Sequence, residues 1–278
     1  MTRARAPGIL LPMLAGVHGR PFIDLEPLLD LSGLDEVHEE ICVGLANVPV
    51  DYTGGSHRAM GIMPASREAE AVVDYGEVIR AMSDGDFATL RELSDAPDEI
   101  DPSSREIGEE RDVPLSRRQM LWLKYRFGVY FPWKVYFEMI PNQFWHEKSS
   151  SDGKDFTRLA KTFFPKTIAL VRRLPFERIG RCNVMGLEAH DHGTVHRDGV
   201  PEEKPEVDHF ISISPTGDKR LFLWDETARE KTPVTGRAYW FNDSDYHGVD
   251  PSPRFQYSIR VDGVFTPDFV ERVKAAIG

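Results

Sequence analysis

The stretch FERIGRCNVMGLEAHDHGTVHRD, residues 176–198, decides the fold that we predict for this chain. From Ile179 to Leu187, larger side chains at odd positions alternate with small or apolar ones at even positions. Because successive side chains of a β-strand point to opposite faces, this period of two predicts a strand. A turn containing Gly193 follows, and after it comes the run His196-Arg197-Asp198.

Further runs after this stretch also have the composition of strands. They are residues 209–214, 220–224, 237–242 and 255–265. Clusters of Pro, Gly, Asp and Ser separate them, as expected for turns. Short strands at even spacing predict a jelly roll or barrel rather than parallel βαβ units. The consecutive aromatic residues Tyr239, Trp240 and Phe241 are expected in the core of this fold.

Residues 65–175 carry helical signals instead. Ser83 and Ser116 each stand three residues before an Asp or Gln that completes a capping box, ahead of apolar residues at helix spacing. Pro165 is suited to open a further helix, because proline is tolerated in the first helical turn. We therefore expect several helices in this part of the chain.

The division of the chain follows from this change of pattern. Residues 1–64 are rich in Gly and Pro, and we expect them to be irregular. We expect residues 1–175 to form a largely helical N-terminal elaboration that packs on a mostly β core of residues 176–278, in one integrated domain. The acidic segment 95–112 predicts a solvated loop, with a substrate lid as the alternative.

Composition excludes several classes of protein. The chain has 278 residues, 41% hydrophobic and 28% charged, with a formal net charge of −11. An acidic protein repels phosphate backbones, so we expect no nucleic-acid partner. No apolar run reaches the roughly 18 residues of a membrane span, so we expect no membrane partner. Pro12 interrupts the apolar run 8–17, so we expect no cleaved signal peptide and a cytoplasmic protein.

The end of the opening stretch has the residue types of a transition-metal site. His196 and Asp198 are two residues apart, so on a strand both side chains would share a face. His247 precedes the last predicted strand, where a strand end can approach the first pair. Two histidines and one carboxylate on one side of an ion leave positions open for a bidentate oxoacid and O2. We therefore predict His196, Asp198 and His247 as metal ligands.

The last predicted strand carries a cation on the same face as a hydroxyl. Ser258 and Arg260 point the same way by alternation. An Arg fork beside a hydroxyl is suited to grip a carboxylate. Arg254 is the alternative cation, although we expect it in the preceding turn. Asn183, which shares its strand face with Arg181, is a further candidate contact for a ligand.

The chain resembles the Fe(II)/2-oxoglutarate-dependent oxygenase superfamily, and looks similar to its aspartyl/asparaginyl and prolyl hydroxylase branches. The resemblance rests on His196-Arg-Asp198, on the run 236–242 that leads to His247, and on Tyr257-Ser-Ile-Arg260. It covers about residues 176–265.

This resemblance implies a double-stranded β-helix, a jelly roll of the cupin-like kind. It implies Fe(II) held by the three predicted ligands, with 2-oxoglutarate and O2 as cosubstrates. It also implies Arg260 as the clamp on the far carboxylate of 2-oxoglutarate. Several branches have the order Arg-x-Ser where this chain has Ser258-x-Arg260, which leaves the part of Ser258 open.

The expected activity is hydroxylation of an unactivated C–H bond. Our hypothesis for the substrate is an amino-acid side chain, in a peptide or a free amino acid of natural-product biosynthesis. Two alternatives stay open: a cupin-type metalloenzyme that does not use 2-oxoglutarate, and a non-catalytic member that binds a ligand. His190 and His192 with His196 faintly resemble a cupin metal motif, although the Glu of that motif is absent.

Overall fold

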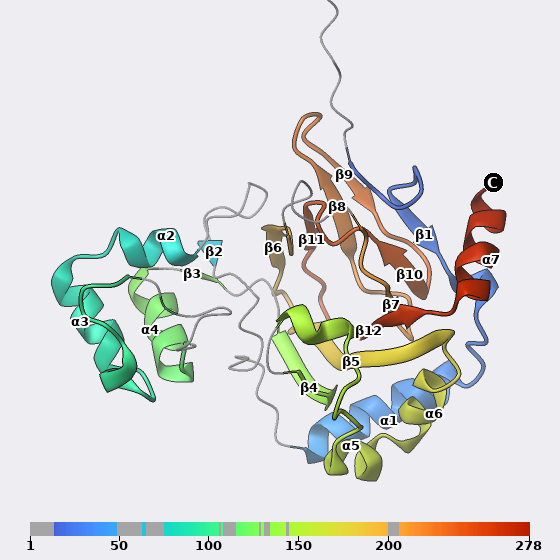
Figure 1. Ribbon diagram of the computed structural model, residues 1–278, viewed down its shortest axis with the longest axis horizontal. Coiled ribbons are helices and arrows are strands. Elements are labelled where there is room, and N and C mark those ends of the chain that lie inside the picture. The colour runs from blue at the N-terminus through green and yellow to red at the C-terminus, as the bar shows by residue number, and fades with distance from the viewer. Residues whose placement is uncertain are drawn as a thin grey trace, which may run out of the picture.

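The computed structural model describes residues 14–48, 63–64, 75–105, 107, 115–127, 129–130, 134–142, 145–199 and 206–278. Within these residues, a larger and a smaller antiparallel sheet lie beside each other, with helices around them (Figure 1). The described part is therefore mostly antiparallel β with packed helices, as the strand and helix signals predicted.

The larger sheet has six strands in the order β1-β10-β7-β12-β5-β4. The strands are β1 (Phe22–Asp24), β10 (Ala238–Phe241), β7 (Phe210–Ile213), β12 (Gln256–Phe265), β5 (Phe176–Leu187) and β4 (Lys134–Ile140). β5 and β12 pair along most of their length, from Leu187 opposite Gln256 to Phe176 opposite Phe265. The alternating stretch therefore forms the middle of this sheet, and the strands predicted at 209–214, 237–242 and 255–265 are confirmed.

The smaller sheet has four strands in the order β6-β11-β8-β9. The strands are β6 (Gly193–His196), β11 (His247–Val249), β8 (Leu221–Asp225) and β9 (Glu230–Pro233). β8 matches the strand predicted at 220–224, whereas β9 and β11 were not predicted. The two sheets do not close into one barrel, because β1 and β4 are edges of the larger sheet and β6 and β9 are edges of the smaller one.

The main apolar core lies against the larger sheet. Tyr239, Trp240 and Phe241 are 1–2% exposed, which confirms that this aromatic run belongs to the core. Three helices that cover this core lie together below β5 in Figure 1. They are α1 (Leu34–Asn47), α5 (Arg158–Phe163) and α6 (Pro165–Val171). The prediction that Pro165 opens a helix is confirmed.

Helix α1 corrects the expectation that residues 1–64 are irregular. Leu34, Val37 and Ile41 recur at helix spacing and are buried, so this segment had a helical pattern that the surrounding Gly and Pro concealed. Gly44 allows close packing, because a Cβ atom there would lie 2.2 Å from the ring of Phe164. β1 also lies in this supposedly irregular part and pairs with β10.

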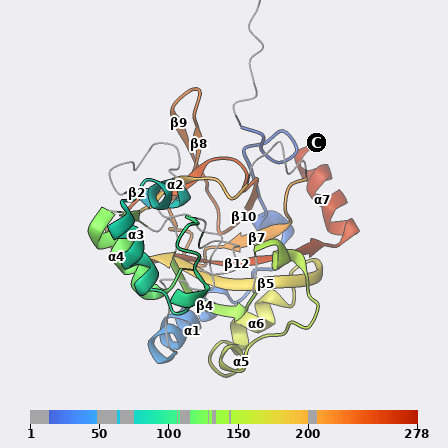
Figure 2. The same cartoon turned by 60° about the vertical axis from the view of Figure 1, so that its left-hand side comes forward.

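A second group of helices has an apolar core of its own. It contains α2 (Tyr75–Arg80), α3 (Asp84–Glu92) and α4 (Arg117–Phe127), and it stands to one side of the sheets (Figures 1 and 2). The Ser116 capping box is complete: its amide donates to Gln119 Oε1 over 2.7 Å, and its hydroxyl accepts from the Gln119 amide over 3.2 Å. Ser83 caps α3 by accepting from the Asp86 amide.

Strand β4 corrects the expectation that residues 65–175 are helical throughout. It pairs with β5, so the larger sheet contains strands from both sides of residue 175. The remaining elements are short or terminal: β2 (Met63–Pro64), β3 (Val129–Tyr130), the 3-10 helices η1 (Glu26–Leu28), η3 (Pro97–Glu99) and η4 (Trp145–Ser149), and α7 (Pro267–Ile277).

The acidic segment 95–112 is described only at residues 95–105 and 107. Ile100 and Ile107 are buried in the core of the second helix group. Part of the described segment is therefore packed against these helices and not solvated. The other residues of the lid prediction lie outside the described part. Among the described helices, none combines the length and the apolar character that crossing a membrane requires.

Candidate metal centre

The three predicted ligands meet where β6 and β11 pair. His196 and His247 are direct partners in the antiparallel register, so their side chains share one face of the smaller sheet. Their ring centroids are 4.4 Å apart. Asp198 lies two residues beyond the end of β6, not within a strand as the spacing argument assumed. Its backbone N–H donates to the Asp243 carbonyl over 2.8 Å, which fixes its place beside the histidines.

These three side chains can hold a metal ion. One donor atom from each lies within 4.8 Å of the others. The separation of His196 Nε2 and Asp198 Oδ1 is 3.6 Å, and both side chains are at most 4% exposed. His247 is fully buried. Asp198 Oδ2 accepts no hydrogen bond from the described residues, so it is open to a ligand. His190 and His192 do not belong to the group of possible metal donors among the described residues.

Hydrogen bonding and burial give His247 the form that a metal requires. Its Nδ1 lies 2.8 Å from the Asp245 carbonyl, and a carbonyl only accepts, so Nδ1 carries the proton. The lone pair is then on Nε2, the atom that is directed toward the site. Burial lowers the pKa of His247 to about 4, so the ring is neutral at pH 7. Neutral imidazole is the form that binds transition metals.

The carboxylate of Asp198 has an environment that suits a bound cation. Burial raises its pKa above the usual range for Asp, and the neighbouring Asp243 raises it further. Arg260 opposes this effect, with Nη1 3.6 Å from Asp198 Oδ2. A divalent ion at the site would stabilise the ionised carboxylate much more than Arg260 alone.

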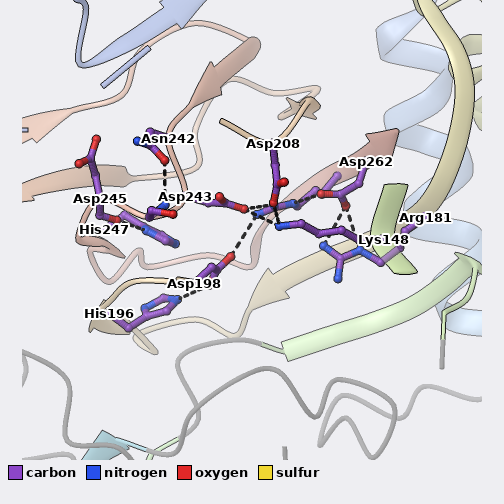
Figure 3. Close-up of polar contacts among 12 residues, drawn as sticks. Lys148, Arg181, His196, Asp198, Asp208, Asn242, Asp243, Asp245, His247 and Asp262 are labelled. Carbon is purple, nitrogen blue, oxygen red and sulfur yellow. Dashed lines mark hydrogen bonds and ion pairs between the residues drawn. The ribbon is translucent and has the colours of Figure 1, made fainter. Parts of the chain in front are cut away.

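The loop from Asn242 to His247, which we call the ligand loop, connects the site to the rest of the molecule (Figure 3). Its Asp245 carboxylate accepts from the backbone amides of Ala15 and Gly16 over 2.8 and 2.7 Å. The same residue orients His247 through its carbonyl. The N-terminal segment before β1 is therefore anchored two residues from a predicted metal ligand.

Arg260 lies in a buried cluster of charges beside the three predicted ligands. Its Nη2 donates to Asp243 over 2.7 Å and its Nε to Asp262 over 3.0 Å, while Nη1 faces Asp198. The ring of Phe210 covers its guanidinium at 3.9 Å. Two nitrogens of Arg260 thus donate to carboxylates of the protein and the third lies at ion-pair distance from Asp198, while the clamp role that the family resemblance implies stays a prediction.

Two further cations belong to this charge cluster (Figure 3). Arg181 pairs with Asp262 through Nη2 at 2.8 Å. Lys148 pairs with Asp243 at 2.9 Å and also with Asp208. These side chains are largely buried, and each charge is paired with an opposite charge, as expected of buried ions. Arg254, the alternative to Arg260, is exposed in the turn before β12.

Lys219 is a potential site residue that we did not predict. It is 7% exposed, and its ammonium donates to Ser258 Oγ over 2.7 Å. Burial and the nearby Arg260 lower its pKa to about 7. The signal was present in the sequence: Lys219 precedes Leu221 and Leu223 by steps of two, so the strand period extends to it.

Asn183 lies in a polar row across the larger sheet. The register places it opposite Arg260, and Arg260 in turn opposite Ser212, whose other partner is Tyr239. Asn183 is fully buried, and neither atom of its amide has a hydrogen-bond partner among the described residues. Buried amides are nearly always satisfied in native proteins, so this one points to a bound molecule or water.

No protein-family model matches the chain, and a search of curated proteins found no match. A solved structure with some likeness is a prolyl-4-hydroxylase from Pseudomonas putida, with a TM-score of 0.25 and 11% identity. The alignment covers 40% of this chain and 66% of that chain, just under two thirds of its length. A likeness of this size does not establish a shared fold.

Proposed function

We propose that this protein is an Fe(II)- and 2-oxoglutarate-dependent oxygenase that hydroxylates an unactivated C–H bond. The observation that carries the proposal is the meeting of His196, Asp198 and His247, with donor atoms within 4.8 Å of one another. Two neutral histidines and one carboxylate are the donor set of non-haem Fe(II) oxygenases. The two facing antiparallel sheets are consistent with the double-stranded β-helix on which we propose that this site is built.

In this mechanism His196, Asp198 and His247 would hold Fe(II). Fe(II), 2-oxoglutarate and O2 together supply the oxidising power to hydroxylate a C–H bond. Asp198 keeps its place through the Asp243 carbonyl, and His247 through the Asp245 carbonyl. Such supporting contacts orient metal ligands and strengthen metal binding. Because Asp198 supplies a carboxylate ligand, halogenation, which needs that position for chloride, is disfavoured.

For the substrate we propose an amino-acid side chain, in a peptide or a free amino acid of natural-product biosynthesis. The net charge of −11 disfavours anionic nucleotides and acyl phosphates. Asp191 and Lys124 interact electrostatically, so the residues just before β6 are near helix α4 of the second group. This group stands where it can form one wall of a substrate groove.

The first test is spectroscopic and needs no substrate. Anaerobic addition of Fe(II) and 2-oxoglutarate should produce a weak visible charge-transfer band that requires both. A cupin-type enzyme or a non-catalytic binding protein predicts no band. The second test is mass spectrometry of peptides and free amino acids incubated with Fe(II), 2-oxoglutarate and O2, read for a gain of one oxygen. Oxidation of only a terpenoid, lipid or nucleobase would refute the proposed substrate class.

A further inference from the structure

We propose that this protein forms a twofold-symmetric dimer in which helix α1 of each copy packs against helix α6 of the other. The proposal is independent of the proposed function. It rests on the outward side of helices α1, α5 and α6, which we call the helical face. The residues that define this face are all exposed, and they are Glu36, Glu39, Val43, Leu159, Lys166 and Arg172.

Helix α1 presents to the solvent an acidic row that ends in an apolar side chain. Glu36, Glu39 and Val43 are three and four residues apart, so they lie along one side of the helix. The residues of α1 that pack in the main core lie on the other side. The row is therefore free of the contacts that hold α1 on the sheet.

Helix α6 presents a basic row. Lys166 and Ala169 of the helix and Arg172 at its C-cap follow one another at intervals of three and are exposed, whereas Ile168 and Val171 are buried. No acidic residue occurs in α6 or in the two arginines that follow it. The helical face thus carries one row of each sign.

The two rows run side by side in opposite directions. The Glu40 carboxylate of α1 accepts from the backbone amides of Lys166 and Thr167, where α6 begins, over 2.8 and 2.7 Å. Arg173, just after α6, donates to the carbonyl of Ser32, just before α1, over 2.9 Å. The two helices are therefore antiparallel neighbours (Figure 1), and the acidic row is level with the basic one.

The charges of the two rows are not matched within one copy. Among the described residues, the side chains of Glu36, Glu39, Lys166 and Arg172 form no ion pair with one another or with any other group. An isologous interface uses the same patch on both subunits, so it needs a patch that is complementary to itself. A surface with both signs in parallel rows meets this requirement, which favours a second copy over a different partner.

The arrangement of the rows selects one twofold axis. An axis that runs parallel to the two helices, between them and in the plane of contact, places α1 of each copy over α6 of the other. The acidic row then faces the basic row twice. An axis perpendicular to the helices would instead stack α6 on α6, with basic residues opposite basic residues.

The same axis brings exposed apolar side chains together. Val43 is 63% and Leu159 38% exposed, and they are two of the three exposed large apolar side chains in the described part of the chain. Val43 is next to Gly44, which packs on Phe164 just past α5. Under the proposed symmetry, Val43 of one copy lies over α5 of the other, which carries Leu159. Burial of these side chains supplies attraction, and the charges set the register.

The net charge of −11 makes this local match necessary, because two acidic copies repel each other at long range. The dimer also leaves the metal triad accessible. In Figure 1 the helices α1, α5 and α6 and the smaller sheet, which carries two of the predicted ligands, lie on opposite sides of β5.

The test is sedimentation velocity of the full chain over a range of concentrations. Wild type should sediment at twice the chain mass of 31.6 kDa, and should dissociate as salt is raised, because the rows are exposed and screened. Glu36→Lys/Glu39→Lys and, separately, Lys166→Glu/Arg172→Glu place like charges opposite each other in both halves of the dimer. Each double variant should raise the dimer dissociation constant about 100-fold.

A mixture of the two double variants is the decisive measurement. In a mixed dimer, the α1 made basic faces the α6 made acidic, and the two unchanged rows face each other. The equimolar mixture should therefore dimerise about as tightly as wild type. A control, Glu226→Lys/Glu230→Lys in the exposed β8–β9 hairpin, makes the same change of net charge as the first variant and should leave wild-type dimerisation intact. Circular dichroism checks that each variant is folded.

Four results would overturn the proposal. Wild type that stays monomeric up to its limit of solubility has no such dimer. A dimer that survives both double reversals, or that the hairpin control also disrupts, is not held by the helical face. A mixture that stays monomeric, with both variants folded, shows that α1 does not face α6. A series of assemblies larger than a dimer contradicts the closed twofold symmetry.

Discussion

The metal triad and the charge cluster around Arg260 lie side by side, yet they are built in opposite ways. In the cluster each described cation is matched by one or more carboxylates at hydrogen-bonding distance, as for Arg260 with Asp243 and Asp262. In the triad, two histidines and one carboxylate bring donor atoms within 4.8 Å of one another. The comparison separates polar residues that compensate one another from polar residues that we propose to bind an ion.

Removal of a triad residue should have the largest effect on function and little on the fold. We expect His196→Ala, Asp198→Ala and His247→Ala each to abolish turnover, because each removes one of three protein ligands. Metal titration and succinate release measure the loss, and circular dichroism checks the fold. Near-wild-type activity in His247→Ala would show that the third ligand is another residue.

Removal of a charge from the cluster should instead lower the stability of the fold. Asp243→Ala leaves Lys148 and Arg260 without a shared partner in a buried position. We expect the free energy of unfolding to fall by about 3–5 kcal/mol in urea titrations. Asp250→Ala, which removes an exposed partner of Lys231, should cost about 0–1 kcal/mol. Similar losses in the two variants would contradict the distinction between cluster and surface pairs.

The pH dependence of stability should show a smaller effect, and it tests the buried Lys219. Its pKa of about 7 is below the ordinary value for lysine, so the folded protein releases this proton at a lower pH than the unfolded chain does. The free energy of unfolding should therefore rise from about pH 7 toward pH 10, where the unfolded chain binds the extra proton. Urea titrations across this range should show a steeper rise in wild type than in Lys219→Met, and equal slopes in the two would assign the pH dependence to other groups.

The anchor at Asp245 should give the smallest effect of the four. Asp245→Asn keeps the backbone carbonyl that orients His247 but weakens the hold on Ala15 and Gly16. We expect metal affinity to fall by about 3- to 10-fold, below the loss of a direct ligand. Metal titration measures it, with Asp250→Asn as the surface control. An unchanged affinity would mean that the N-terminal contact does not support the metal site.

Local patterns in the sequence predicted the elements whose residues carry their own signal. The alternation in 179–187 predicted β5, and the Ser116 capping box predicted α4. His196, Asp198 and His247 were brought together as expected, because two of them are only two residues apart in sequence and the third begins a strand that pairs with β6. The spacing did not predict that Asp198 lies beyond the strand.

The features that the sequence did not reveal depend on partners far along the chain. β4 was missed although its Val135, Tyr136 and Phe137 favour strands, because the helical signals on both sides outweighed one short run; it pairs with β5. Helix α1 was concealed because Gly and Pro around it outweighed a short apolar period. The contacts of Arg260 with Asp243 and Asp262 depend on the folded arrangement, so motif spacing alone did not predict them.

The contact between Gly16 and Asp245 joins residues 229 positions apart in the chain. Contacts of such long sequence separation form late, because a large loop must close before they contribute any stability. During synthesis, His196 and Asp198 leave the ribosome well before His247, and the earliest described residues wait for the ligand loop. We therefore expect the candidate metal site to be completed near the end of folding, when a partly folded chain no longer offers a looser set of donors to other metals.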